Sequence, residues 1–213
     1  MELVDAVRAR RMVRAYDPGR PVVDEVLQRL LDLAVRAPSA GFTQGWDFVV
    51  MRGPVLERFW ELTTDGARVP DSWLRGMRTA PLCLLVLSDP DRYLDRYAEP
   101  DKGWTDRDPG RWAAPYWDVD TGMAALLVLL GAVDEGLGAC FFGVQPEHHD
   151  TVKAELGVPG GRHVVGVVSL GHPAPDRRSP SLRRGRRPLA EVVHDGRFGT
   201  PPAWTAPEGE PRS

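Results

Sequence analysis

Arginine side chains gather near the two ends of this chain. Five lie within the first 20 residues and seven more between residues 177 and 197, whereas lysine occurs only twice. The planar guanidinium group matches phosphate and carboxylate oxygens better than the ammonium group of lysine does. Arg10, Arg11 and Arg14 are spaced so that they can converge on one anion. This segment predicts a phosphate site, although a solvated basic turn has the same composition.

A second segment with possible chemistry covers residues 37–46, with the sequence APSAGFTQGW. Its small residues would let a flat ligand approach the backbone closely. Gln44 offers both a donor and an acceptor to the edge of a heteroaromatic ring. Taken alone, an ordinary connection from a helix to a strand explains the same residues.

Hydropathy patterns predict the elements that must position these segments. Apolar residues recur at helical spacing up to Ala34, and Pro38 ends that helix. Helices are predicted at residues 2–9, 54–63, 72–78, 119–135 and 146–156, and a further helix is opened by residues 21–25 and runs to residue 34. Strands are predicted at residues 46–51, 82–87, 139–144 and 163–170. Helices mixed with a few buried strands indicate an α+β fold or an α/β sandwich.

The helix predicted at residues 119–135 is apolar almost all round, so we expect it at the centre of the domain or in a dimer interface. The longest apolar run, residues 123–133, is shorter than the roughly 20 residues that cross a bilayer. Charged Glu2 and Asp5 lie where a signal peptide would be apolar, which favours a cytoplasmic protein. Cys83 and Cys140 lie in apolar stretches, as buried reduced thiols do.

Residues 88–114 have no clean period and are rich in charged, proline and aromatic residues. We expect a long surface excursion, an insertion around residues 88–117 that acts as an ordered lid. Trp112, Tyr116 and Trp117 would line a substrate pocket and stack on a planar acceptor. Simple packing of these rings on the core is an equally good interpretation.

Composition and charge limit the other classes of function. The net charge of −3 gives no reason to expect nucleic acid or an anionic membrane as a partner. The five histidines show no spacing typical of metal ligands, and we place His148 and His149 on a helix surface. We expect a single domain over residues 1–198 and a flexible tail over 199–213.

The two segments lie about 30 residues apart, and in this order they resemble the N-terminal signature of the nitroreductase family. That signature is a basic Arg-Arg/His-Ser-x-Arg/Lys-x-Phe/Tyr stretch followed by Ala-Pro-Ser-x-x-x-x-Gln-Pro-Trp. Three later motifs also resemble the family: 136–143 (GLGACFFG), 166–173 (GVVSLGHP) and 184–194 (RGRRPLAEVVH). The resemblance covers roughly residues 2–198.

The resemblance implies a fold and an assembly. Members have a central mixed, mainly antiparallel sheet flanked by helices, and they form intertwined homodimers with two FMN sites at the subunit interface. The residues implied for FMN binding are Arg10, Arg11, Met12 (through its backbone amide), Arg14, Phe142, Gly143, Arg184, Arg186 and Arg187 from one subunit, with Pro38, Ser39, Ala40 and Gln44 from the other. Gly41 and Phe42 are expected in the substrate pocket.

This chain departs from the family pattern at three positions. Met12 stands where serine is common, Phe42 where asparagine is often found, and Gly45 where proline is usual. Gly-Phe before the glutamine resembles a flavin-fragmenting branch of the family, but that branch has aspartate at the position of Met12. These departures bear on which substrate the protein takes and not on whether it binds flavin.

The resemblance implies an FMN-dependent oxidoreductase in which NAD(P)H, a transient donor, gives hydride to flavin N5 and then leaves. An electron-poor small molecule, such as a nitroaromatic or a quinone, takes its place. The chain has no Gly-x-Gly-x-x-Gly dinucleotide fingerprint, as expected for a transient donor. The alternatives are a non-catalytic protein that sequesters flavin, and a flavoenzyme that uses a deazaflavin donor or acts as a specialised dehydrogenase. No general acid can be assigned from the sequence.

Overall fold

The computed structural model describes residues 1–64, 72–176 and 179–205. The contacts divide the chain into two units, residues 1–176 and 177–213, and each is described by itself. This division falls at Asp176, whereas the sequence-based boundary at residue 198 stays a prediction. Arg177 and Arg178 of the C-terminal arginine group lie outside the described residues.

The first unit is built on one sheet. Its strands are β1 (Trp46–Met51), β2 (Leu82–Ser88), β3 (Gly138–Phe142) and β4 (His163–Gly171). They lie in the order β1-β2-β4-β3, and every neighbouring pair is antiparallel. An isolated parallel bridge joins Met12 to Ala139 of β3. The prediction of a mainly antiparallel sheet is therefore confirmed.

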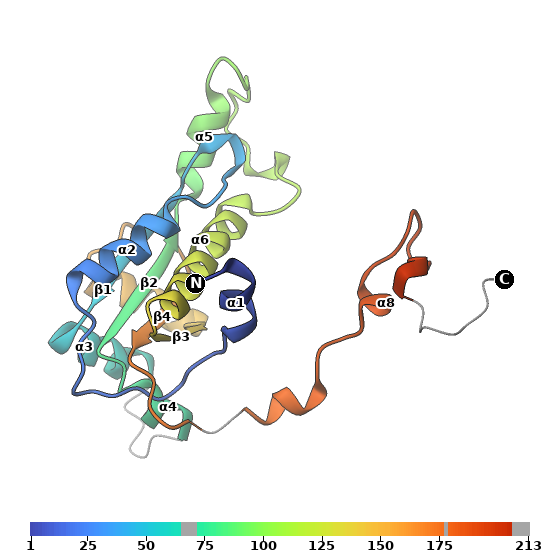
Figure 1. Cartoon of the computed structure of the whole chain (residues 1–213). Coiled ribbons are helices and arrows are strands. Elements are labelled where there is room, and N and C mark those ends of the chain that lie inside the picture. The colour runs from blue at the N-terminus through green and yellow to red at the C-terminus, as the bar shows by residue number, and fades with distance from the viewer. Residues whose placement is uncertain (65–71, 177–178, 206–213) are drawn as a thin grey trace. The chain divides into compact units, whose positions relative to one another are not determined.

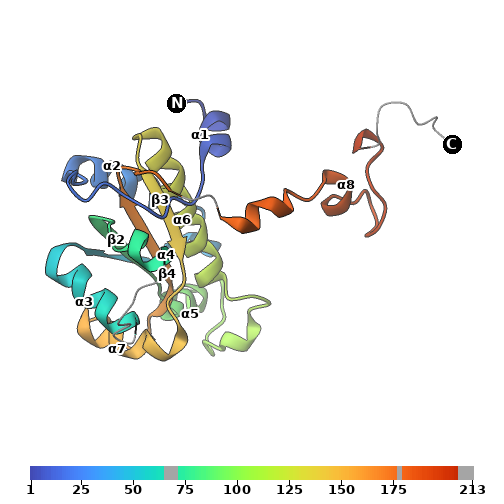
Figure 2. The ribbon, with the colours of Figure 1, turned by 90° about the horizontal axis from the view of Figure 1, so that it is seen from below.

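Helices cover both faces of this sheet. One face carries α2 (Asp24–Ala34) and α6 (Tyr116–Asp134), and the other carries α3 (Gly53–Thr63), α4 (Ser72–Met77) and α7 (His149–Glu155) (Figures 1 and 2). Alternate residues of β2 belong to two apolar clusters, one under each helical layer. All seven residues of β2 are buried, because a strand between two layers meets side chains on both of its faces.

Helix α6 is the long apolar helix expected from the sequence, and it begins three residues earlier than predicted, at Tyr116. It packs on α2 so closely that a Cβ atom on Gly131 would lie 2.8 Å from the Leu33 side chain and 2.9 Å from that of Leu30. By length and composition alone it could cross a membrane, the one helix among the described residues that could. Half of its apolar window is buried inside the fold, while Val119 and Leu126 face outward.

The prediction of an excursion without regular structure is wrong for residues 90–98. These residues form α5 (Pro90–Ala98), which begins with a proline in its first turn. The Asp89 side chain caps the helix by accepting a hydrogen bond from Arg92 N at 3.3 Å, as short polar residues at helix starts often do. Only Tyr93 of this helix is buried. Tyr93, Leu94 and Tyr97 do lie at helical spacing, but the helix is short and rich in charged residues, so the pattern was taken as part of a longer stretch without a clean period.

The remaining predicted elements of the first unit are confirmed to within a few residues. The N-terminal helix is α1 (Leu3–Ala9), and a 3₁₀ turn at Pro146–His148 leads into α7. Both cysteines are free and buried, as expected. Burial raises the pKa of the Cys83 and Cys140 thiols, so both stay protonated at neutral pH.

The second unit contains short helical turns. These are a 3₁₀ helix at Pro180–Arg184, α8 (Leu189–Val192) and a 3₁₀ turn at Ala203–Thr205. The last turn lies within the tail that was predicted to be flexible, and residues 206–213 of that tail lie outside the described residues.

Close packing of α4 against the arginine segment gives a test of this architecture. A Cβ atom on Gly76 would overlap the carbonyl oxygen of Arg14, a backbone atom that cannot move aside easily. We expect Gly76→Ala to lower the free energy of unfolding by about 2 kcal/mol, measured by chemical denaturation. Gly160→Ala is the matched control, because a Cβ atom there meets nothing within 4 Å. Equal stability of the two variants would contradict the contact.

Candidate functional site

Residues 12–16 of the arginine segment are fixed to the outer edge of β3 at Met12 and Val13, and to Pro173 just after β4 at Tyr16. Val13 N donates to Ala139 O at 2.9 Å, and Tyr16 N donates to Thr79 Oγ1 at 2.8 Å. The buried Tyr16 hydroxyl donates to Val13 O at 2.7 Å and lies 2.7 Å from Ser169 Oγ. Burial raises the pKa of Tyr16, so the hydroxyl remains a donor. The segment therefore enters the site with a fixed backbone.

Arg10 and Arg11 line a pocket of about 190 Å³ at the end of α6. The other residues around it are Ala9, Val13, Leu129, Val133, Gly136, Leu137, Gly138, Ala139 and Pro173. Arg10 Nη1 is buried and has no hydrogen-bond partner. A buried charged donor left without an acceptor is costly, so this atom is suited to an anionic ligand.

Two further predicted phosphate ligands are placed differently. Arg14 Nη1 donates to Met12 O at 3.3 Å, within the same segment. Met12 Sδ accepts from Phe141 N at 3.4 Å, and its side chain packs against both apolar clusters. Neither side chain lines the pocket of Arg10, and the role expected for the backbone amide of Met12 stays a prediction.

The segment predicted to line a flat ligand has an unusual backbone. Gly41, Phe42 and Gln44 adopt φ values of +62°, +56° and +54°. These values lie in the left-handed region that favours glycine. Gln44 N donates to Ser39 Oγ at 2.9 Å and closes the turn. We call residues 39–45 the left-handed loop. Strained backbone of this kind is held in place by its surroundings and clusters at functional sites.

Side chains of this region face several environments. Gln44 lines a shallow cleft of about 470 Å³ together with Thr43, Trp46 and Arg92. Phe42 is 77% exposed, and Pro38 is exposed before the loop. The loop thus offers an apolar ring and an amide group to a ligand or to another chain.

The pocket of Arg10 and the left-handed loop lie at opposite ends of α6. Ala40 N donates to Asp120 Oδ2 at 2.8 Å in the second turn of that helix, whereas the pocket of Arg10 is lined by Val133 in its last turn. The separation along the helix is about 20 Å at 1.5 Å per residue. Within one chain, the loop that contains Ala40 and the pocket of Arg10 are therefore far apart.

Phe142 and Gly143 lie at and just after the C-terminal end of β3, beside two tryptophans that the sequence analysis missed. The ring of Trp60 stacks on Phe142 with centroids 5.6 Å apart and planes at 10°, and Trp73 meets Phe142 edge-on at 5.6 Å. These four residues line a pocket of about 150 Å³. Both tryptophans fall in predicted helices, but neither carries a sequence signal for this site.

The predicted substrate-pocket aromatics come together around Trp112. Its ring centroid lies 4.4 Å from Tyr97 and within 5.9 Å of those of Tyr93, Trp104, Tyr116 and Trp117. We call these six side chains the aromatic cluster. They pack mainly on one another, which favours the structural interpretation of Trp112 and Trp117. The role of Tyr116, which is partly exposed, in a substrate pocket stays a prediction.

Arg184, Arg186 and Arg187 belong to the second unit, where all three are exposed. Arg187 precedes the short helix α8, and its Nη2 atom donates to Glu191 O of that helix at 2.9 Å. Their expected role at the FMN phosphate stays a prediction.

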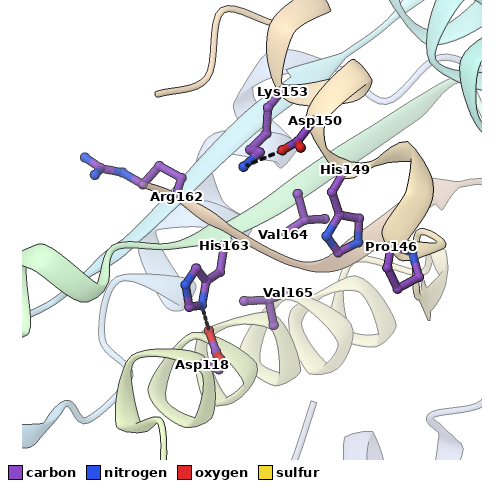
Figure 3. A pocket seen from close by; sticks show the side chains of 9 residues that line it. All are labelled: Asp118, Pro146, His149, Asp150, Lys153, Arg162, His163, Val164 and Val165. Atoms are coloured by element: carbon purple, nitrogen blue, oxygen red, sulfur yellow. Dashed lines mark ion pairs between the residues drawn. The ribbon is translucent and has the colours of Figure 1, made fainter. Parts of the chain in front are cut away.

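A polar cleft of about 560 Å³ lies where β4 begins, outside the predicted site (Figure 3). Its two cations are paired, Arg162 with Asp47 and Asp89 and Lys153 with Asp150. Its lining residues are Asp118, Pro146, His149, Asp150, Lys153, Arg162, His163, Val164 and Val165. Among the described residues, no group of three His, Cys, Asp or Glu side chains is arranged to hold a metal.

His149, which was predicted on a helix surface, is the first residue of α7 and is partly exposed in this cleft. Its ring points toward the cleft in Figure 3, and its Nε2 atom lies 3.0 Å from Val144 O. His163 Nδ1, on the facing strand, lies 3.4 Å from Asp118 Oδ1. Residues of α7 and of the start of β4 thus line the same cleft, which helical periodicity alone did not show.

Comparisons with known proteins agree with this architecture. The model of the Nitroreductase family matches residues 7–172. An NADH dehydrogenase from Thermus thermophilus is 31% identical over 208 residues, covering 88% of this chain and 93% of that protein. A protein from Methanothermobacter thermautotrophicus, named as a candidate NADH dehydrogenase/NAD(P)H nitroreductase, is 30% identical over 179 residues, covering 82% of this chain and 78% of that protein.

Solved structures share the fold. A protein from Desulfovibrio desulfuricans solved in complex with FMN has a TM-score of 0.68 at 24% identity, covering 93% of this chain and 98% of that one. B. megaterium NfrA1 has a TM-score of 0.72 at 18% identity, covering 92% of this chain and 74% of that one. With the family match over most of the first unit, these likenesses lead to one conclusion. The chain belongs to the nitroreductase family.

Proposed function

We propose that this protein is a homodimeric FMN-dependent oxidoreductase that passes hydride from NAD(P)H to an electron-poor acceptor such as a nitroaromatic or a quinone. The family and the names of its relatives support the oxidoreductase class. The observation that carries the FMN assignment is the buried, unpartnered Nη1 atom of Arg10 in a small pocket beside Arg11.

The residues of this pocket fit a phosphomonoester. Two guanidinium groups offer several N–H donors to the oxygens of a dianion, and the pocket is closed on its other side by apolar residues of α6. The backbone behind Arg10 is fixed to β3 through Val13. A fixed backbone reduces the conformational freedom that must be lost on binding, which favours affinity.

FMN, when bound, supplies the hydride-transfer chemistry at its N5 atom. The chain's own residues hold and shield it. Phe142 is backed by Trp60 and Trp73, so the strand end that would meet the ring is rigid and apolar. Arg14 lies in the segment next to this edge, where its positive charge would stabilise a reduced anionic ring.

A dimer would complete the site. In one chain, the left-handed loop is attached to the second turn of α6 and the pocket of Arg10 lies at its last turn. A second chain is therefore needed to bring such a loop to the flavin. Val119 and Leu126 on the outer side of α6 are exposed in the single chain. A second copy packed on this side of α6 would bury them.

Removal of the Arg10 guanidinium tests the phosphate assignment. We expect Arg10→Gln to weaken FMN binding by about 10- to 100-fold in a fluorescence titration, since a charge-assisted hydrogen bond is lost. The affinity for riboflavin, which lacks the phosphate, should stay unchanged. Arg20→Gln removes an exposed arginine of the same region and should leave both affinities unchanged. An equal loss for FMN and riboflavin would place the phosphate elsewhere.

Anaerobic mixing of the FMN-loaded protein with NADH or NADPH tests the reaction. We expect loss of absorbance near the flavin maximum with at least one donor, followed by recovery when a quinone is added. Failure of both donors to bleach the flavin would favour a sequestering protein or an enzyme that uses another donor.

A further inference from the structure

The left-handed loop is held from one side by a buried carboxylate. Asp120 of α6 is 2% exposed, and its Oδ2 atom accepts hydrogen bonds from Ala40 N and from the Tyr93 hydroxyl, both at 2.8 Å. Burial and the neighbouring carboxylate raise the pKa of Tyr93, so its hydroxyl stays protonated and donates. Asp120 therefore connects the loop to helix α5 of the insertion.

Helix α5 also contacts the loop backbone directly. Arg96 Nε donates to Gly41 O at 2.9 Å, while its two terminal nitrogens pair with Asp101 at 2.7 and 2.8 Å. A Cβ atom on Gly41 would lie 2.8 Å from the Tyr97 ring. Figure 1 shows α5 beside the segment that follows α2. The guanidinium is thus oriented by Asp101 and held against the loop.

These contacts hold the backbone next to Phe42. Its backbone has a φ of +56°, which a residue with a side chain rarely adopts, and its ring is 77% exposed. A large apolar ring on strained backbone gains little from the fold of its own chain. Strain maintained by several tertiary contacts is typical of residues that meet a ligand.

We propose that Tyr93, Arg96 and Asp120 are positioning residues that hold Phe42 as a rigid wall of the acceptor site and thereby set the preference for planar aromatic acceptors. We call these three residues the loop clamp. The proposed preference for planar aromatic acceptors rests on the proposed function, because Phe42 would lie at the flavin site of the other subunit. The clamp itself depends only on contacts within one chain.

Hydrogen exchange of the flavin-free protein tests the clamp without any activity. We expect Tyr93→Phe, which removes the hydroxyl and keeps the ring, to speed amide exchange at Ala40 and Gln44 about tenfold. Arg96→Gln should act similarly. Exchange in β2 should not change. Arg107→Ala is the matched control, because Arg107 pairs with Asp91 and Asp95 on the exposed side of α5. The exchange pattern of this variant should match that of the parent protein.

Acceptor kinetics of the FMN-loaded protein test selectivity. With each variant saturated with FMN, Tyr93→Phe should raise the KM for a naphthoquinone about fivefold, the factor that one ordinary hydrogen bond controls, with ferricyanide reduction unchanged. Phe42→Ala should show the same change in KM. In the double variant, Tyr93→Phe should add nothing to Phe42→Ala, because the clamp acts through that ring.

Several results would overturn the proposal. Unchanged exchange at Ala40 and Gln44 in both clamp variants would mean that the loop needs no clamp, and faster exchange throughout the chain in both would mean general support of the fold. Faster local exchange with an unchanged naphthoquinone KM would remove the role in selectivity. A chain that binds no FMN would instead refute the proposed function, while the exchange experiment would still decide whether the clamp exists.

Discussion

The attachment of Met12 and Val13 to the free edge of β3 is the constraint on which the proposed anion site depends. An edge strand leaves backbone groups unpaired, and Val13 N uses one of them, the carbonyl of Ala139. Tyr16 then fixes the segment from below by placing its hydroxyl between Val13 O and Ser169 Oγ. The fixed backbone of the following residues keeps Arg10 at its pocket, although its Nη1 atom has no hydrogen-bond partner there.

Helix α6 is the second organising element, because it relates the two halves of the proposed site. Its first turns carry Asp120, which holds the left-handed loop, and its last turns line the pocket of Arg10. The helix is buried on one side by the sheet and α2 and keeps apolar side chains on the other. Helix α6 therefore sets the distance between the left-handed loop and the pocket of Arg10. Two chains related by symmetry could combine the loop of one with the pocket of the other.

Much of this arrangement could be predicted from the sequence. The strands and the long helix follow from strong local patterns: β2 is apolar throughout because both of its faces are covered, and α6 is apolar almost all round. The arginine segment and the loop of small residues were recognised by residue type and order. Their placement at opposite ends of one helix could not be predicted, since it depends on long-range packing.

Other features were missed for identifiable physical reasons. Helix α5 is short and rich in charged residues, so its apolar stripe was taken as part of a longer stretch without a clean period, although Asp89 and a proline mark its start. The thioether of Met12 packs on both apolar clusters, which the sequence did not indicate, while the role expected for its backbone amide stays a prediction. Left-handed backbone at Phe42 and Gln44 has no sequence signal, because glycine would have been expected there.

A crystal structure of the protein grown with FMN tests the central claim most directly. The account predicts a phosphate group within hydrogen-bonding distance of Arg10 Nη1, with the ring beside Phe142 of the same chain and the left-handed loop of a second chain. A flavin bound elsewhere, or Arg10 Nη1 turned to solvent while FMN is bound, would contradict it.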